Sequence, residues 1–308
     1  MAFKILVTSQ KGGVGKSTLS ANLVAYLSRT LGLGVTLIDW DPHGSSSNWL
    51  KQAPNVGAVV QHLSLPVDQG GNRPIFEARL QMRRAASECD ILVCDLTWSD
   101  SLAGELMFEF DMVLVPTSVS EIELAATSGF LSRNRWVFDS ASARRPMLVV
   151  CPTRVLNEQL NSDVFTKQRF PVSFMLAPPI LEAQSARDLF ERGYLMDARD
   201  IGGESFREFG EAICAAREIR MAQAHQPRQP VPVKLTERDS SSHRVPLTPS
   251  KSSVLDTVTS GSQFSVLGRY RQRKLAEDSE AVVNSRSLAQ MGIPEFLKRL
   301  ARSSSAKL

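Results

Sequence analysis

The chain has 308 residues, a net charge of +4 and a pI of about 9.0, and 43% of its residues are hydrophobic, which is ordinary for a globular protein. No apolar run approaches the ~18 residues of a transmembrane helix. The first strand-like run begins near the first residue and leaves no room for a signal peptide. We therefore expect a cytoplasmic protein. Its cysteines lack metal-ligand spacing and are interpreted as reduced core residues: Cys89, Cys94, Cys151 and Cys214.

The charge is distributed unevenly along the chain. Residues 1–223 hold 22 Lys and Arg against 25 Asp and Glu, whereas residues 224–308 hold 14 against 7. The basic pI therefore belongs to the second segment. A net charge of +7 there predicts an anionic partner, either nucleic acid or an acidic lipid surface.

Short apolar runs alternate with longer helical patterns up to about residue 222. The expected strands are mostly continuous apolar runs, typical of parallel strands buried on both faces: Lys4–Thr8, Val35–Asp39, Ile91–Asp95, Met112–Pro116, Met147–Pro152 and Val172–Leu176. The expected helices are Ser17–Leu31, Ile75–Ser87, Ile122–Ser140, Leu181–Arg192 and Glu204–Ala224. This order predicts a doubly wound, mostly parallel α/β sheet of the P-loop NTPase kind, with its ligand site at the carboxyl ends of the strands.

A glycine-rich turn, QKGGVGKST, joins the first strand to the first helix. The backbone N–H groups of such a turn converge on a phosphate at the positive end of the helix dipole. Lys16 would reach the β- and γ-phosphates of ATP, and the Ser17 hydroxyl would complete a Mg²⁺ shell. The residues predicted to bind the nucleotide are Gly12, Gly13, Val14, Gly15, Lys16, Ser17 and Thr18.

The strict pattern G-x-x-x-x-G-K-[ST] fails here because Gln10 occupies its first glycine position. The run that begins at Lys11, KGGVGKST, instead resembles the signature of the ParA/MinD family of deviant Walker A ATPases. The resemblance covers residues 1–222 and implies a homodimer that sandwiches ATP and Mg²⁺. It also implies that Lys11 reaches the phosphates of the partner subunit, as an arginine finger does in trans.

A second motif, DWDPHG, spans residues 39–44 after the second strand. It resembles the switch I sequence D-x-D-P-Q-G of that family. The resemblance implies that Asp41 polarises the attacking water, and Asp39, at the strand end, is expected to support the Mg²⁺ shell. His43 occupies the position at which the family has glutamine. It could act as a switch that titrates, or as a neutral side chain that donates one hydrogen bond.

The third strand ends in a carboxylate, Asp95, as a Walker B strand does. We expect Asp95 to hold Mg²⁺ through water, the alternative being an aspartate that caps a turn. The family continues as D-x-P-P or D-x-P-G in switch II, whereas this chain reads DLTW over residues 95–98. This departure leaves the rate of hydrolysis, and its coupling to a change of shape, open at this point. The hydrolysis that we expect is slow and stimulated by a partner.

Later segments suggest further contacts. The resemblance implies adenine contacts around Pro152–Arg154 and Ala177–Ile180. Residues 115–117 and 179–193 resemble the branch associated with conjugation and T-DNA processing. Six arginines fall where ParA-type proteins bind DNA without base readout, and acidic neighbours leave a solvated helix face as the alternative: Arg187, Arg192, Arg199, Arg207, Arg217 and Arg220.

The composition changes after the ATPase domain, which we assign to residues 1–223. Residues 224–290 read as a basic linker rich in Pro and Ser, expected to be mostly disordered. Residues 291–308 contain a short amphipathic basic helix, and its segment 293–302 resembles the membrane-targeting helix of MinD-type proteins. Docking on a partner protein or on the protein's own core are the alternatives.

Together these patterns predict a ParA-like ATPase that dimerises on binding Mg·ATP and resets by slow hydrolysis. The expected output is the positioning or segregation of DNA cargo on nonspecific DNA at the nucleoid, through an adaptor protein. Recruitment of a conjugative DNA-processing complex is a version of this function. The alternatives are a MinD-like regulator at the membrane surface and a nucleotide-binding scaffold with poor hydrolysis. No cysteine pattern supports a bridging iron–sulfur cluster.

Overall fold

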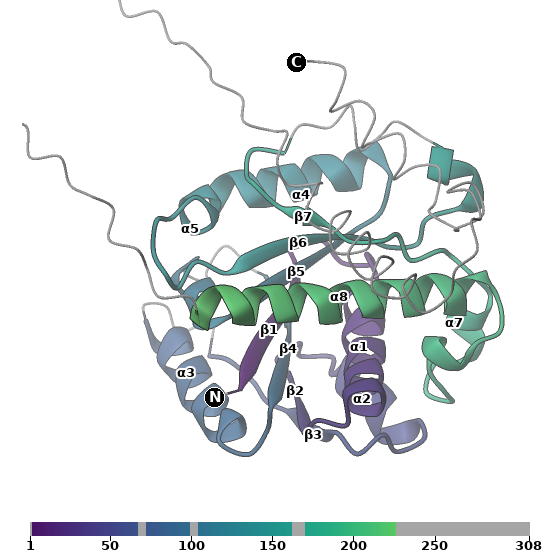
Figure 1. Ribbon diagram of the computed structural model, residues 1–308, viewed down its shortest axis with the longest axis horizontal. Helices are drawn as coiled ribbons and strands as arrows, with labels where there is room; N and C mark the ends of the chain where they lie inside the picture. The colour runs from purple at the N-terminus through teal and green to yellow at the C-terminus, as the bar shows by residue number, and fades with distance from the viewer. Residues whose placement is uncertain (1, 67–71, 99–103, 162–169, 226–308) are drawn as a thin grey trace, which may run out of the picture.

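The computed structural model describes residues 2–66, 72–98, 104–161 and 170–225. These residues form one parallel sheet in the order β3-β2-β4-β1-β5-β6-β7 (Figure 1). The strands are β1 (Phe3–Ser9), β2 (Val35–Asp39), β3 (Val59–His62), β4 (Ile91–Thr97), β5 (Met112–Thr117), β6 (Met147–Pro152) and β7 (Met175–Leu176).

Parallel strands need crossover connections, and the helices lie in these connections. The α-helices are α1 (Lys16–Leu31), α2 (Ser45–Gln52), α3 (Arg73–Ala86), α4 (Glu121–Arg133), α5 (Arg135–Phe138), α7 (Ser185–Asp188) and α8 (Ile201–His225). Short 3₁₀ helices are η2 (Gly104–Glu109), η3 (Asn157–Asn161) and η4 (Leu195–Asp197).

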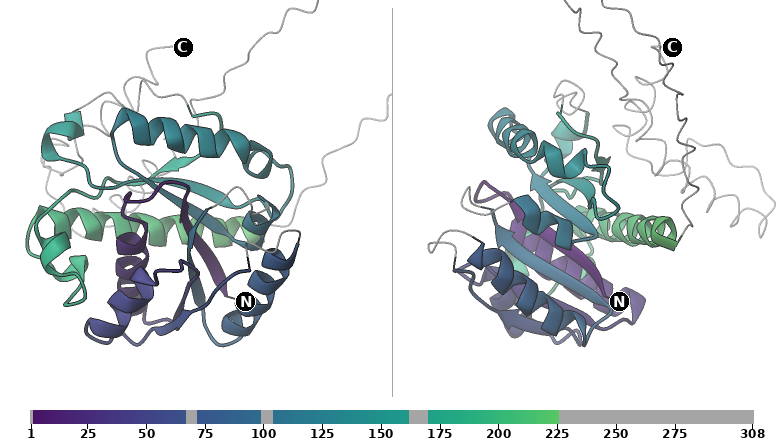
Figure 2. Two further views of the ribbon diagram at one scale, coloured as in Figure 1. Left: turned by 180° about the vertical axis from the view of Figure 1, so that it is seen from behind. Right: turned by 90° about the vertical axis from the view of Figure 1, so that its left-hand side faces the viewer.

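Helices cover both faces of the sheet, as Figure 2 shows from two further sides. Alternate strand residues point to opposite faces, so Ile5 and Val7 join one core and Leu6 joins the other. The first core packs α1, α2 and α8 on the sheet, and the second packs α3, α4 and α5. The central strands are therefore buried on both sides, and the predicted doubly wound parallel fold is confirmed.

In the second half of the domain, two of the predicted helices differ from those in the structure. The predicted helix Ile122–Ser140 divides into α4 and α5 at Asn134, whose Nδ2 donates to the Phe130 carbonyl at 3.0 Å. The predicted helix Leu181–Arg192 is wrong except for α7. Leu181 pairs with Val155 in an isolated parallel bridge, and Glu191 takes a φ of 59°, so neither end of that segment is helical.

Two elements of the first half, α2 and β3, were not predicted, and β7 is shorter than the expected run Val172–Leu176. The four residues of β3 are half-exposed at the edge of the sheet and carry no continuous apolar run. Residues 224–290 are predicted to be a linker, but Ala224 and His225 are the last two residues of α8. The rest of that segment and the predicted basic helix lie outside the described residues. In the part of the chain that the structure describes, no helix is long and apolar enough to cross a bilayer.

Candidate functional site

The glycine-rich turn lies at the carboxyl edge of the sheet, between β1 and α1. Gly13 and Gly15 have φ values of 80° and 83°, in the left-handed region that glycine adopts without strain. Gly15 is the N-cap of α1 and has no side chain with which to cap it. The first-turn N–H groups of α1 are therefore available to an anionic ligand, which the helix dipole also favours.

Residues that follow β6 brace this turn from the side. Thr153 Oγ1 donates to the Val14 carbonyl at 2.7 Å, and Arg154 Nη1 donates to the Gly13 carbonyl at 2.9 Å. Arg154 has a φ of 54°, an uncommon conformation for a residue with a side chain. The resemblance implied adenine contacts around Pro152–Arg154, and in the structure Thr153 and Arg154 contact the glycine-rich turn.

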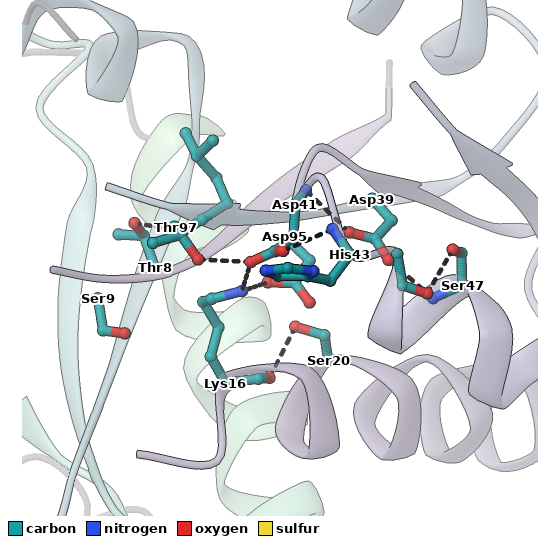
Figure 3. A network of polar contacts seen from close by, with 12 residues as sticks. Thr8, Ser9, Lys16, Ser20, Asp39, Asp41, His43, Ser47, Asp95 and Thr97 are labelled. Carbon is teal, nitrogen blue, oxygen red and sulfur yellow. Dashed lines mark hydrogen bonds and ion pairs between the residues drawn. The ribbon is translucent and has the colours of Figure 1, made fainter. Parts of the chain in front are cut away.

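Lys16, the first residue of α1, lies in a carboxylate network drawn in Figure 3. Its Nζ is 2.7 Å from Asp95 Oδ1 at β4 and 3.1 Å from Asp41 Oδ2 in the loop after β2. The Lys16 side chain is only 8% exposed, and Asp95 is fully buried. Three residues that are distant in sequence thus form one buried ion-pair network at the glycine-rich turn.

Burial and charge act against each other in this network. Burial would lower the pKa of Lys16, but Asp95 and Asp41 outweigh it and the pKa is raised. Burial would raise the pKa of Asp41, but hydrogen bonds from Thr97 and the His43 amide and the Lys16 charge lower it to about 2. For Asp95, burial dominates and raises the pKa, although the Lys16 ammonium partly opposes it.

Asp39 lies beside this network but has different partners. Its Oδ1 accepts the Asp41 N–H at 3.0 Å, and its Oδ2 accepts the Ser47 N–H at 2.9 Å. Both carboxylate oxygens therefore hold the loop between β2 and α2 in place. Support of a Mg²⁺ shell by Asp39 stays a prediction.

His62, at the end of β3, is a site residue that the sequence did not reveal. Its Nε2 lies 3.0 Å from the Asp41 carbonyl oxygen, and its ring packs where a Cβ on Gly44 would come within 2.8 Å. Gly44 has a φ of 62°, so a glycine suits both its backbone and its contact. A histidine in a short edge strand gives no sequence signal of this role. His43 is exposed and contributes its N–H to Asp41 Oδ1 at 3.0 Å.

Lys11 lies at the outer end of the same turn. Its Nζ is 3.8 Å from Glu123 Oε1 in the first turn of α4, and its side chain is 40% exposed. The two lysines of the motif therefore have different surroundings, one buried among carboxylates and one at the surface.

The sequence DLTW departs from the family pattern, and its structure shows what the departure does. β4 runs on to Thr97, whose Oγ1 donates to Asp41 Oδ2 at 2.5 Å. The Trp98 N–H donates to the Ser9 carbonyl at 3.0 Å, and the buried Trp98 ring packs edge-on against Phe130. The start of the predicted switch II is thus a paired strand anchored in the core.

The side chains at this edge suit a hydrated divalent cation beside a phosphate. Asp95 Oδ2 is buried and has no hydrogen-bond partner, so one carboxylate oxygen remains for a bound water or metal. Ser17 follows Lys16 in the first turn of α1. Among the described residues, no three histidine, cysteine or acidic side chains form a metal-binding cluster. Such a site suits Mg²⁺, because this ion keeps several of its waters and binds one or two carboxylates together with phosphate oxygens.

Half of the six arginines predicted to contact DNA hold the protein itself together. Arg207 donates to the Met196 and Ala198 carbonyls, and Arg220 donates to the Ala143 and Arg145 carbonyls. The Arg217 guanidinium lies over the Phe3 ring, 5.6 Å from its centroid. Arg187 pairs with Glu182 at the surface, whereas Arg192 and Arg199 are exposed.

A doubly wound parallel sheet with a glycine-rich turn that brings a lysine to two strand-end carboxylates defines a P-loop nucleotide-binding protein. Comparison with known families agrees. The CobQ/CobB/MinD/ParA nucleotide binding domain matches residues 5–201, and the chain belongs to this family. The predicted family is therefore confirmed.

Similar proteins have several roles. The chain is 24% identical over 196 residues to the maintenance of carboxysome distribution protein A of Halothiobacillus neapolitanus, covering 64% of this chain and 85% of that protein. A putative plasmid partition protein from Borrelia burgdorferi, solved with AMPPNP, shares the fold with a TM-score of 0.54 and 18% identity, over 70% of this chain and 99% of that one. The cobyrinic acid a,c-diamide synthase of Mycobacterium smegmatis, solved with ADP and magnesium, has a TM-score of 0.55 and 20% identity over 71% and 96%.

Proposed function

We propose that this protein is a ParA-like ATPase whose cycle of Mg·ATP binding, dimerisation and slow hydrolysis positions a cargo in the cell. The observation that carries the proposal is the buried Lys16 ammonium, held between Asp41 and Asp95 at a glycine-rich turn. A phosphate in the turn would compete with these carboxylates for the ammonium. Nucleotide binding would thereby be linked to the loop that contains Asp41.

Each residue has a separate part in this proposal. The backbone of residues 12–18 and the Lys16 ammonium bind the phosphates, and Ser17 and Asp95 hold the hydrated metal. When bound, Mg²⁺ would neutralise phosphate charge. Asp41, with its pKa lowered to about 2, stays ionised at neutral pH and orients a water as a hydrogen-bond acceptor rather than as a strong base.

Dimerisation would supply Lys11 to the partner subunit's nucleotide. The support for this step is that Lys11 is the more exposed lysine of the motif and its ion pair with Glu123, at 3.8 Å, is long. Lys11 is at the surface and Glu123 is 17% exposed, and so long a pair contributes little to stability, so Lys11 can change partners.

The cargo is inferred by analogy. The relatives are named for carboxysome distribution and plasmid partition, both of which distribute a large object in the cell. The basic segment 224–308 gives a sequence-based reason to expect DNA as the track. Since four of the six core arginines contact other residues of the chain, we assign DNA binding chiefly to that segment, with Arg192 and Arg199 as core contributors. A protein of this kind would act in the cytoplasm at the nucleoid.

ATPase activity is tested by phosphate release and by light scattering of the full chain with Mg·ATP. We expect slow turnover and ATP-dependent dimers for the natural sequence, neither for Lys16→Ala, and nucleotide binding without dimers for Lys11→Ala. Tight ATP binding with turnover equal to that of Lys16→Ala would instead identify a nucleotide-binding scaffold.

The track is tested by binding of the full chain to nonspecific duplex DNA, with and without ATP, at two salt concentrations. ATP-dependent binding that weakens steeply with salt supports the DNA proposal. The second candidate, a MinD-like membrane cycle, is favoured by the apolar and basic spacing of residues 293–302. ATP-dependent flotation with anionic liposomes, lost on deletion of residues 291–308, together with no DNA binding, would establish it instead.

A further inference from the structure

Thr97 is the closest hydrogen-bond donor to the Asp41 carboxylate. Asp41 Oδ1 accepts the His43 N–H at 3.0 Å, and Oδ2 accepts both Lys16 Nζ at 3.1 Å and Thr97 Oγ1 at 2.5 Å. Hydrogen bonds to an ionised acceptor are short and strong, and this one joins two segments that are 56 residues apart.

Thr97 is held on a rigid element. It pairs with Ser9 of β1 in the parallel register of the sheet, and the next residue, Trp98, donates its N–H to the Ser9 carbonyl at 3.0 Å. The Trp98 ring is buried in the core against Phe130, with ring centroids 5.9 Å apart. The hydroxyl is therefore presented from a fixed position at the end of β4.

Asp41 lies in a loop, and its backbone and its carboxylate are held by different groups. Asp39 accepts its N–H and His62 lies against its carbonyl oxygen, so these contacts fix the backbone. The rotation of the carboxylate is fixed only by the donors on its oxygens. Of these donors, Lys16 is the one for which a phosphate in the turn competes, which leaves the Thr97 hydroxyl and the His43 N–H.

We propose that Thr97 is a positioning residue: its hydroxyl orients the Asp41 carboxylate toward the phosphate-binding turn and couples residues 39–44 to the end of β4. The inference rests on the function proposed above, in which Asp41 orients the attacking water. Both family patterns, D-x-P-P and D-x-P-G, have a proline at the position of Thr97, and proline has no hydroxyl with which to do this. The coupling is thus specific to chains with a hydroxyl at this place.

The test compares three full-length variants. Thr97→Val removes the hydroxyl and keeps the shape, Thr97→Ser restores a hydroxyl, and Thr36→Val makes the same change within buried β2, three residues before Asp39. We expect Thr97→Val to lower kcat about tenfold to a hundredfold, the range for a misplaced catalytic group. We expect its affinity for Mg·ATP to be unchanged, because Lys16 and the glycine turn are intact.

A second readout does not depend on turnover. The Asp41 carboxylate accepts the His43 N–H, so a carboxylate that is free to rotate should no longer protect this amide. Hydrogen–deuterium exchange over residues 39–44 should therefore be faster in Thr97→Val than in the natural sequence, and should equal that of the natural sequence in Thr97→Ser and Thr36→Val. A valine variant with natural kcat, or with natural exchange over these residues, would overturn the proposal. Failure of Thr97→Ser to restore both properties would also overturn it, since the hydroxyl would then not be the cause.

These outcomes separate the inference from the proposed function. If the natural sequence turns over no faster than Lys16→Ala, the ATPase proposal fails and hydrogen exchange alone decides on the coupling. Thr97→Ala, which also removes the hydroxyl, serves as the second variant if valine at residue 97 prevents folding, with the same expected results.

Discussion

The two lysines of the glycine-rich turn are five residues apart and have opposite surroundings. Lys16 is 8% exposed and lies 2.7 and 3.1 Å from two carboxylates, whereas Lys11 is 40% exposed and lies 3.8 Å from one. The inner lysine begins α1, and the outer one faces α4 across the edge of the sheet. One motif thus supplies a fixed charge and a movable one.

The comparison of Lys11 with Lys16 shows that burial determines whether a charged side chain can change its partner. A buried charge must always have an oppositely charged partner, because loss of one charge leaves the other desolvated and unpaired. An exposed charge exchanges its partner for water at little cost. The buried Lys16 therefore fits the phosphate-binding role proposed above, and the more exposed Lys11 fits the proposed role toward a second subunit.

Of the changes considered, removal of the buried Lys16 charge should lower the free energy of unfolding the most. Lys16→Ala leaves Asp95 buried without its cation, and we expect the free energy of unfolding to fall by about 3–5 kcal/mol. Urea denaturation at neutral pH measures this, with Lys51→Ala on the exposed side of α2 as the matched control. A loss no greater than that of the control would show that the network does not stabilise the domain.

Low pH should lower the free energy of unfolding because Asp41 becomes protonated. The pKa of Asp41 is lowered to about 2, below its unfolded value of about 3.9, so its contribution is present above pH ~4 and is lost as pH falls toward ~2. Between pH ~5 and ~3, we expect the natural sequence to lose about 1 kcal/mol more stability than Asp41→Asn. Asp95, whose pKa is raised, acts with the opposite sign in both proteins.

Urea unfolding of both proteins at these two pH values measures the difference. Equal losses of stability in the natural sequence and in Asp41→Asn would mean that Asp41 is not held ionised by its neighbours. Salt should change this difference little, because the Asp41 side chain is only 12% exposed.

Disruption of the ion pair between Lys11 and Glu123 should change the free energy of unfolding the least. Glu123→Gln removes the partner of Lys11, and we expect the free energy of unfolding to change by less than about 0.5 kcal/mol. Glu121→Gln, in the same first turn of α4, is the control for the helix dipole. A larger loss in Glu123→Gln alone, measured by urea denaturation, would mean that Lys11 is fixed rather than movable.

Local patterns in the sequence determined the architecture and the type of site. Continuous apolar runs identified the central strands, because strands buried on both faces need apolar residues at every position. The glycine turn identified the start of α1, because its backbone conformations are accessible to glycine. Asp39 and Asp95 come together since parallel strands end at one edge of the sheet, and the two residues are paired in the register of β2 and β4.

Tertiary structure alone decided which partner each charged or polar group takes. Nothing local to Asp39 reveals that both its oxygens hold the next loop, and nothing near Thr97 reveals that its hydroxyl reaches Asp41. The arginines of α8 read as a DNA-binding face, yet Arg207 and Arg220 donate to backbone carbonyls. Periodicity and turn chemistry depend on neighbours in sequence, whereas a hydrogen bond depends on distances set by strand order across the sheet, and these exist only in the folded chain.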